Sequence, residues 1–207
     1  MVKVIAALFI SPLAGGLAGA LICRILRAAL RRAHLRITLP LRILQGILLC
    51  LQGMSYGMND AQKTMGILAA AFLMAYPSGF ATFVHQGLET VPWWVKLISV
   101  GSIAVGALIG SASILKTLGK GVFNLHLTEA LSVQAAVTGV VSYASAIGGP
   151  VSSGQVLASA IVGAGSVTRR RAVHWSVVVL ILRSWVITIP GAALLGALLM
   201  AALRLFW

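Results

Sequence analysis

Apolar stretches long enough to cross a membrane fill most of this chain, and they restrict its fold more than any motif does. They cover residues 2–23, 43–76, 95–113, 127–167 and 175–203. A helix of about 20 residues spans a hydrocarbon core about 30 Å thick. Because lipid offers no hydrogen-bond partners to the backbone, such stretches form helices. The sequence therefore predicts an all-α, polytopic integral membrane protein.

The charge of the chain indicates the same class. Only 9% of the residues are charged and the mean hydropathy is +1.01, whereas a soluble domain carries about 25% charged residues. The formal net charge of +13 comes from basic residues, most of which stand in short clusters between the apolar stretches, where they orient a membrane protein. We therefore expect the lipid bilayer, and no nucleic acid, as the partner of this charge.

Three basic clusters predict how the chain is oriented. They are the arginines between residues 24 and 36, the pair Lys116 and Lys120, and the arginine triplet at 169–171. Clusters of this kind stay on the cytoplasmic side, which places the N-terminus and the C-terminus outside. No segment has the composition of a soluble domain, so residues 1–207 are expected to form a single membrane domain.

A polar decapeptide at residues 57–66 interrupts this apolar background. It contains Asp60, the only aspartate of the chain. An ionised carboxylate at the centre of a membrane helix costs about 2.5 to 3.5 kcal/mol on insertion scales, so Asp60 requires a partner there. A bound cation, a bound proton and the ammonium group of Lys63 are the candidates.

Two helix breaks are expected where polarity occurs at membrane depth. Residues 43–76 would form a helix about 50 Å long, so we expect two pieces that meet at residues 57–60. Residues 127–167 must start and end in the cytoplasm, either as two thin spans or as a re-entrant pair around residues 148–154. The start of a half-helix suits an anion, and unwound carbonyls with Asp60 suit a cation. This pattern favours an ion-coupled transporter of a small anion.

At these two places the sequence resembles the inorganic phosphate transporter (PiT) family. Residues 57–66 are similar to the first family signature in its bacterial form, and residues 149–156 are similar to the second. Residues 11–13, 116–120 and 185–190 also follow the order of the C-terminal half of that family. The resemblance covers nearly the whole chain.

The resemblance implies one half of an inverted-repeat secondary transporter, with broken or re-entrant helices, in a bacterial inner membrane. The complete carrier would move inorganic phosphate together with Na⁺ or H⁺ and would need no other cofactor. By position, Asn59 and Asp60 would belong to the substrate and ion site, with Asp60 as the candidate Na⁺ ligand. Ser152 and Ser153 would donate hydroxyl hydrogen bonds to phosphate.

Two positions depart from the second signature. Gln155 stands where the family has a histidine, and Gly154 replaces a threonine. A titratable donor and a hydroxyl are therefore absent, and Gln155 is kept as a candidate contact of the substrate.

The length of the match is a further departure, because the chain resembles only the C-terminal half. A homodimer would have to insert in both directions, against the basic clusters. We therefore expect a second chain that carries the complementary half, or an oligomer. The alternative function is an inactive or regulatory membrane subunit with the same fold. An enzyme is not expected, because no pair of a nucleophile and a base stands out.

Each candidate residue also has a purely structural interpretation. Asp60 and Lys63 lie three residues apart and could form a buried ion pair, although Lys63 could instead contact phosphate. A lysine beside Asp60 could also take the place of a metal cation, which favours protons as the coupling ion. Asn59 could cap a second half-helix, and Ser152 and Ser153 could start or pack a helix.

Overall fold

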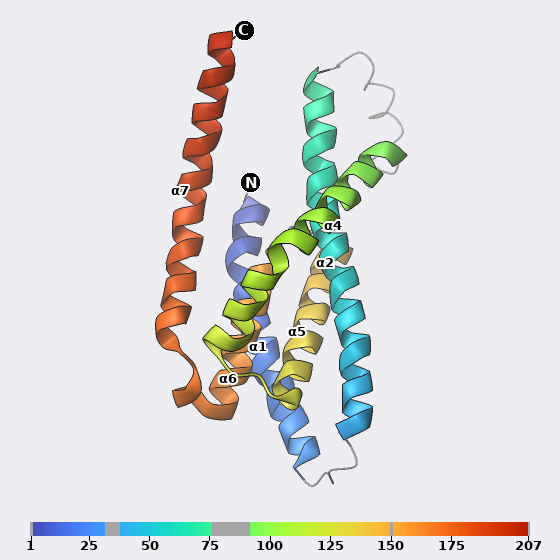
Figure 1. The fold of residues 1–207 in the computed structure, drawn as a ribbon, viewed down its shortest axis with the longest axis vertical. Coiled ribbons are helices and arrows are strands. Elements are labelled where there is room, and N and C mark those ends of the chain that lie inside the picture. Colours follow the sequence, from blue (N-terminus) through green and yellow to red (C-terminus); the bar gives the residue numbers. More distant parts are fainter. Residues whose placement is uncertain (1, 32–37, 76–91, 150, 207) are drawn as a thin grey trace.

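The computed structural model describes residues 2–31, 38–75, 92–149 and 151–206, and every regular element in these ranges is helical (Figure 1). The long helices are α1 (Val2–Leu30), α2 (Thr38–Ala75), α4 (Trp93–Lys116), α5 (Leu127–Ala146), α6 (Ser153–Arg169) and α7 (Trp175–Phe206). Two short elements follow α4 and α6, namely η3 (Thr117–Val122) and η4 (Arg170–Ala172). The all-α prediction is confirmed.

Within the described parts of the chain, three helices are long and apolar enough to cross a membrane by length and composition. The segments are Phe9–Leu30 in α1, Trp93–Gly110 in α4 and Trp175–Ala202 in α7. Helices α2 and α5 are not among them, and both carry buried polar side chains, such as Gln52 and Ser132. Polar groups at membrane depth are tolerated where protein covers them, and these two side chains are covered, although α2 also exposes apolar side chains such as Met54 and Met58.

Helices α5 and α6 form a hairpin. The chain turns at Gly148, whose φ of +67° lies in the left-handed region that glycine adopts without a Cβ penalty. The N–H group of Gly149 donates to the carbonyl oxygen of Ala144 at 2.8 Å, which satisfies one of the last carbonyls of α5. The loop of six residues between Ala146 and Ser153 includes residue 150, which lies outside the described residues.

The tip of the hairpin stops short of the far end of α2, as expected of a re-entrant pair, which is one of the two arrangements that the sequence left open. Its two ends lie at the same end of the molecule (Figure 1), and its tip is hydrogen-bonded to α2 at Tyr56, Asn59 and Lys63. Helix α2 then continues from Thr64 to Ala75, about 18 Å of helix beyond the tip. The hairpin therefore turns back where α2 still has three turns to run.

The expected break in α2 is wrong. Thr38–Ala75 is one continuous α-helix. The decapeptide contains good helix formers, namely Met58, Ala61, Gln62 and Lys63. Its buried polar side chain, Asn59, donates a hydrogen bond to the Val151 carbonyl of the hairpin, so the backbone of α2 does not need to unwind. Among the described residues of the two signature segments, only the turn between α5 and α6 leaves backbone carbonyls outside a helix.

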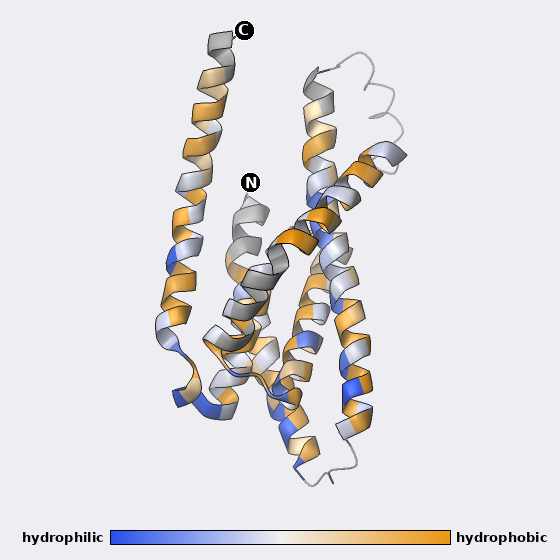
Figure 2. Cartoon of the chain, viewed as in Figure 1, coloured by the Kyte–Doolittle hydropathy of each residue, from blue (hydrophilic) through white to orange (hydrophobic). Residues whose placement is uncertain are grey.

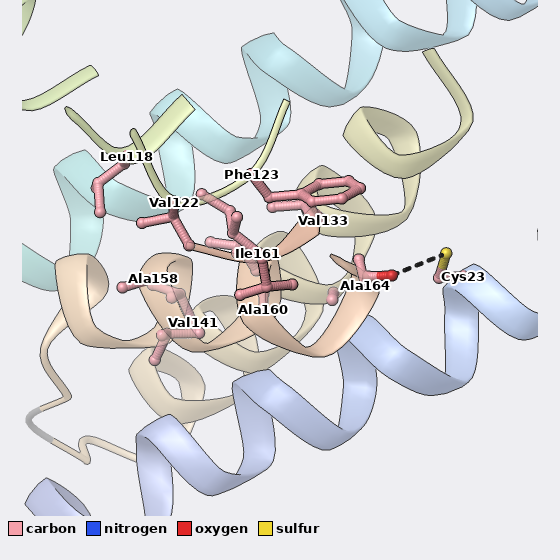
Figure 3. Packing of buried hydrophobic residues seen from close by; sticks show 14 residues of the cluster. Cys23, Leu118, Val122, Phe123, Val133, Val141, Ala158, Ala160, Ile161 and Ala164 are labelled. Atoms are coloured by element: carbon pink, nitrogen blue, oxygen red, sulfur yellow. Dashed lines mark hydrogen bonds between the residues drawn. The ribbon is translucent and has the colours of Figure 1, made fainter. Parts of the chain in front are cut away.

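The core lies where α1 packs against α6. Gly19 of α1 approaches α6 so closely that a Cβ atom there would lie 2.5 Å from the carbonyl oxygen of Ala160. Small residues allow two membrane helices to come this near. A buried cluster of apolar side chains from α1, η3 and the segment after it, α5 and α6 adjoins this contact (Figure 3); its members include Cys23, Val122, Phe123, Val133, Val141 and Ile161. This part of the fold holds the hairpin in place.

Basic residues gather at one end of the molecule. In Figure 2 the hydrophilic colour concentrates around η4 and the end of α1, whereas Figure 1 places the C-terminus at the opposite end and the N-terminus in the opposite half of the molecule. Arg32 and Arg36 of the first predicted cluster lie outside the described residues. The arrangement agrees with the predicted orientation, in which the basic clusters lie on one side of the membrane and both termini on the other. Which side is the cytoplasmic one stays a prediction.

Candidate functional site

One face of α2 meets the tip of the α5–α6 hairpin. Tyr56, Asn59 and Lys63 follow one another at intervals of three and four residues, which places them on the same face of a helix. Each of the three side chains donates a hydrogen bond to a backbone carbonyl just before or at the start of α6. The acceptors are the carbonyls of Val151 and Ser153, which flank Ser152 in the sequence. The two signature segments are therefore joined in space.

Asn59 and Lys63 converge on the same two oxygen atoms. The Asn59 amide nitrogen Nδ2 donates to the Val151 carbonyl at 2.9 Å and to Asp60 Oδ1 at 3.2 Å. The Lys63 ammonium nitrogen Nζ donates to Asp60 Oδ1 at 3.1 Å and also to the Val151 carbonyl. Each oxygen accepts from both side chains, so the carboxylate, the amide and the ammonium form one closed cluster.

Burial differs sharply within this cluster. The Asn59 side chain is buried, with a relative exposure of 1%, whereas the side chains of Lys63 and Asp60 are 33% and 39% exposed. The buried amide satisfies its donors internally, as such groups do. The charged pair, in contrast, borders the outside of this chain and remains within reach of a ligand or of another polypeptide.

Polar residues further along α2 extend the contact, and the sequence analysis missed them. Gln52 Nε2 donates to the Tyr56 hydroxyl at 3.2 Å, and that hydroxyl donates to the Ser153 carbonyl at 3.4 Å. The hydroxyls of Ser55 and Ser142 lie 2.6 Å apart and join α2 to α5. The polar residues at 52, 55, 56, 59 and 63 repeat at helical spacing, and that periodicity could have identified this face.

The start of α6 provides unused donors. Ser152 occupies the N-cap position but its side chain makes no capping hydrogen bond, and Ser153 is the first helical residue. The first N–H groups of a helix have no acceptor within it, and they carry a partial positive charge of about half a unit. The prediction that these serines start a helix is correct, and their hydroxyls remain available to an anion.

Gln155 is not bonded to the other candidate residues. Its Oε1 atom is buried without a hydrogen-bond partner, which leaves an acceptor that normally has one. The structure thus brings Asn59, Asp60 and Lys63 together with Ser152 and Ser153, whereas Gln155, in the first turn of α6, makes no hydrogen bond to them. The interpretation of Asn59 as a helix cap is wrong, because Asn59 lies inside the continuous α2.

The arrangement can hold an anion next to a cation. Helix-start N–H groups, serine hydroxyls and the Lys63 ammonium are all donors, which suit the oxygens of a small oxyanion. Asp60 and the Val151 carbonyl are hard oxygen acceptors, which suit a proton or an alkali cation. Among the described residues, no group of three or more His, Cys, Asp or Glu side chains forms a metal centre. Whether these residues bind a substrate stays a prediction.

Comparison with known families identifies relatives. Residues 30–196 match the family described as "Phosphate transporter family". The "Probable low-affinity inorganic phosphate transporter" of Bacillus subtilis (strain 168) is 30% identical over 198 residues, which is 95% of this chain and 57% of that protein. The protein of the same name from Rhizobium meliloti (strain 1021) is 35% identical over 158 residues, or 76% of this chain and 45% of that protein.

A third relative, from Mycobacterium leprae (strain TN), carries the same name and is 31% identical over 147 residues, which is 71% of this chain and 34% of that protein. The chain thus spans between about a third and somewhat more than half of the length of these relatives. No solved structure matches the chain significantly.

Proposed function

This chain belongs to the phosphate transporter family, and from that membership we propose that it forms one half of a secondary carrier that moves inorganic phosphate across the membrane together with H⁺ or Na⁺. The family is one of transporters and not of enzymes. The observation that carries the proposal is the cluster at the hairpin tip, where Asn59, Asp60 and Lys63 meet the start of α6.

The two sides of the cluster bind different ions in this proposal. Phosphate is bound by the N–H groups at the start of α6 and by the hydroxyls of Ser152 and Ser153, because a helix N-terminus favours anions. Lys63 adds positive charge from α2, and Gln155 borders the anion on α6. Asp60 binds the co-transported cation, whose charge offsets that of phosphate, so that the two ions bind together more readily than either does alone.

The exposure of the charged pair supports a second polypeptide at the site. Lys63 and Asp60 remain 33% and 39% exposed, and polar groups in a membrane are stable when protein or water covers them. We propose that a complementary half, carried by a second chain in the opposite orientation, closes the site. The carrier lies in a bacterial inner membrane with both termini of this chain outside, because the basic clusters share one end of the molecule.

The proposal is tested by phosphate uptake into vesicles that contain this chain with its complementary half. Asp60→Asn removes the charge and keeps the size. We expect at least a tenfold loss of uptake, since a hydrogen bond to a charged group contributes about 1.5 to 3 kcal/mol. Gln62→Ala is the matched control, because Gln62 lies exposed on another face of the same turn and its loss should leave uptake unchanged.

Three outcomes would contradict the proposal. Uptake that Asp60→Asn leaves intact would remove the role of the carboxylate. A complete pair that inserts normally but moves no phosphate would favour the alternative of a regulatory or inactive subunit. Antiparallel dimers of this chain alone that transport phosphate would refute the need for a separate complementary half.

A further inference from the structure

Two acceptors at the candidate site are already occupied by a cation that belongs to the chain. Lys63 Nζ lies 3.1 Å from Asp60 Oδ1 and is also hydrogen-bonded to the Val151 carbonyl. A carboxylate oxygen and a carbonyl outside any helix are the kind of ligands from which carriers build sodium sites. The lysine ammonium thus bridges the two oxygens that a bound sodium ion would bridge.

Asn59 is a second hydrogen-bond donor to the same two oxygen atoms. Asn59 Nδ2 donates to the same carbonyl at 2.9 Å and to the same carboxylate oxygen at 3.2 Å. A carbonyl oxygen has two lone pairs, and on Val151 both have a donor. The carbonyl belongs to a buried residue, so water cannot readily replace either donor. While Lys63 remains in place, each of these two oxygens therefore already accepts two hydrogen bonds.

A sodium ion would also meet repulsion at this position. The ammonium group carries a full positive charge, and two unit charges about 4 Å apart interact by about 4 kcal/mol at an effective dielectric constant of 20. The residues present therefore do not fit a sodium ion at Asp60, although Asp60 is the candidate ligand by sequence. Without the lysine, Asp60 Oδ1 and the Val151 carbonyl are released, and rotation of the Asn59 amide by 180° adds a third oxygen.

We propose that Lys63 is a tethered substitute for the coupling sodium ion, so that this carrier binds phosphate and transports it without Na⁺. The inference rests on the proposed function, because it concerns the driving ion of the same site. It narrows the choice between Na⁺ and H⁺ to the proton. Replacing Lys63 by a neutral residue converts the site into one that binds Na⁺.

The first test measures stability and does not depend on transport. The full chain is purified in detergent, and its thermal unfolding is compared in NaCl and in choline chloride at equal ionic strength. We expect no sodium-specific change in Tm for the wild type or for Lys63→Arg. For Lys63→Gln and Lys63→Met we expect Na⁺ at ten times its Kd to raise Tm by about 3 to 6 °C. Lys96→Gln is the control, because Lys96 is an exposed lysine on α4.

The second test uses phosphate uptake with the complementary half present. Uptake by the wild type should be equal in Na⁺ and choline, whereas uptake by Lys63→Gln should be stimulated several-fold by Na⁺. Absence of phosphate uptake in every variant would contradict the proposed function, but the sodium dependence of Tm would still decide the role of Lys63.

Each variant has a result that would contradict the proposed role of Lys63. Sodium-specific stabilisation of the wild type, or an equal response in Lys96→Gln, contradicts the proposal. So does a folded Lys63→Gln that ignores Na⁺. A neutral variant that folds only in Na⁺ supports the proposal, whereas neutral variants that unfold in Na⁺ and in choline alike contradict it.

Discussion

The hairpin touches its two neighbours in different ways. Against α1 the contact is made by backbone and small side chains, and a Cβ atom at Gly15 would lie 2.7 Å from the carbonyl oxygen of Val156. Against α2 the contact at the tip is made by polar side chains that reach across to carbonyls. The first contact is buried and apolar, and the second is polar and borders the outside through Asp60 and Lys63.

These two contacts of the hairpin should have different roles, because the α1 contact supports the fold and the α2 contact belongs to the candidate site. A contact fixed by close packing has no alternative arrangement at low cost, because interiors are packed as densely as crystals. A contact made of a few hydrogen bonds can exchange its donors for those of a ligand at a small net cost. A carrier needs both, and here the α1 side holds the hairpin while the α2 side can respond to ions. Substitutions on the two sides should therefore affect different properties.

The largest expected effect on stability is at the α1–α6 contact. Gly163→Leu places a side chain against the carbonyl oxygen of Gly16, and overpacking of this kind costs about 3 kcal/mol. The measurement is thermal unfolding of the purified protein in detergent. The matched control is Gly53→Leu on α2, where a Cβ atom meets nothing within 4 Å. Equal destabilisation by both variants would mean that the α1–α6 contact is looser than described.

A smaller loss of stability is expected for Asn59→Ala. It leaves the buried Val151 carbonyl with Lys63 as its remaining side-chain donor, and an impaired buried hydrogen bond costs about 1 to 2 kcal/mol. The loss of phosphate uptake should be larger than this loss of stability alone would cause, because the substitution displaces the hairpin tip and leaves the α1–α6 core unchanged. Gln62→Ala provides the control in the same unfolding and uptake assays. A loss of stability without loss of uptake would place Asn59 with the supporting contacts instead.

The link between α2 and α5 predicts a measurable coupling. Ser55 and Ser142 share a hydrogen bond of 2.6 Å, and bonds between membrane helices contribute about 0.6 kcal/mol on average. A double-mutant cycle of Ser55→Ala and Ser142→Ala, followed by thermal unfolding, should give a coupling energy of about that size. Ser55→Ala combined with Ser184→Ala should be additive, because the Ser184 hydroxyl bonds within its own helix α7. Additivity of the first pair would show that the hydroxyls are independent.

The smallest effect is expected for Tyr56→Phe. The hydroxyl bond to the Ser153 carbonyl is long at 3.4 Å, so its loss should cost no more than about 0.5 kcal/mol. Tyr143→Phe is the control, because Tyr143 is 69% exposed and should change neither stability nor uptake. A loss of stability at Tyr56 as large as that of Asn59→Ala would show that the Gln52–Tyr56 pair supports the tip more strongly than its geometry indicates.

Local sequence patterns located the two segments that meet at the hairpin tip, while their role as a site stays a prediction. The lone aspartate, the adjacent Asn59 and Lys63 three residues later marked the segment of α2 that contacts the hairpin, and the glycines at 148 and 149 marked its turn. The patterns failed at the helix break in α2, because the length of an apolar run does not show whether its polar side chains have partners. Those partners, the carbonyls of Val151 and Ser153, belong to backbone about 90 residues away.

The sequence by itself determined the membrane class, the helical fold and the family, since these follow from the distribution of apolar and charged residues and from contiguous signatures. Only the tertiary structure decided that α2 runs unbroken, that α5 and α6 turn back beside it, and that Lys63 bridges Asp60 and the Val151 carbonyl. The physical reason is that a polar or charged side chain in a membrane protein bonds to whichever partner the packing of distant helices brings to it, and no local pattern records that choice.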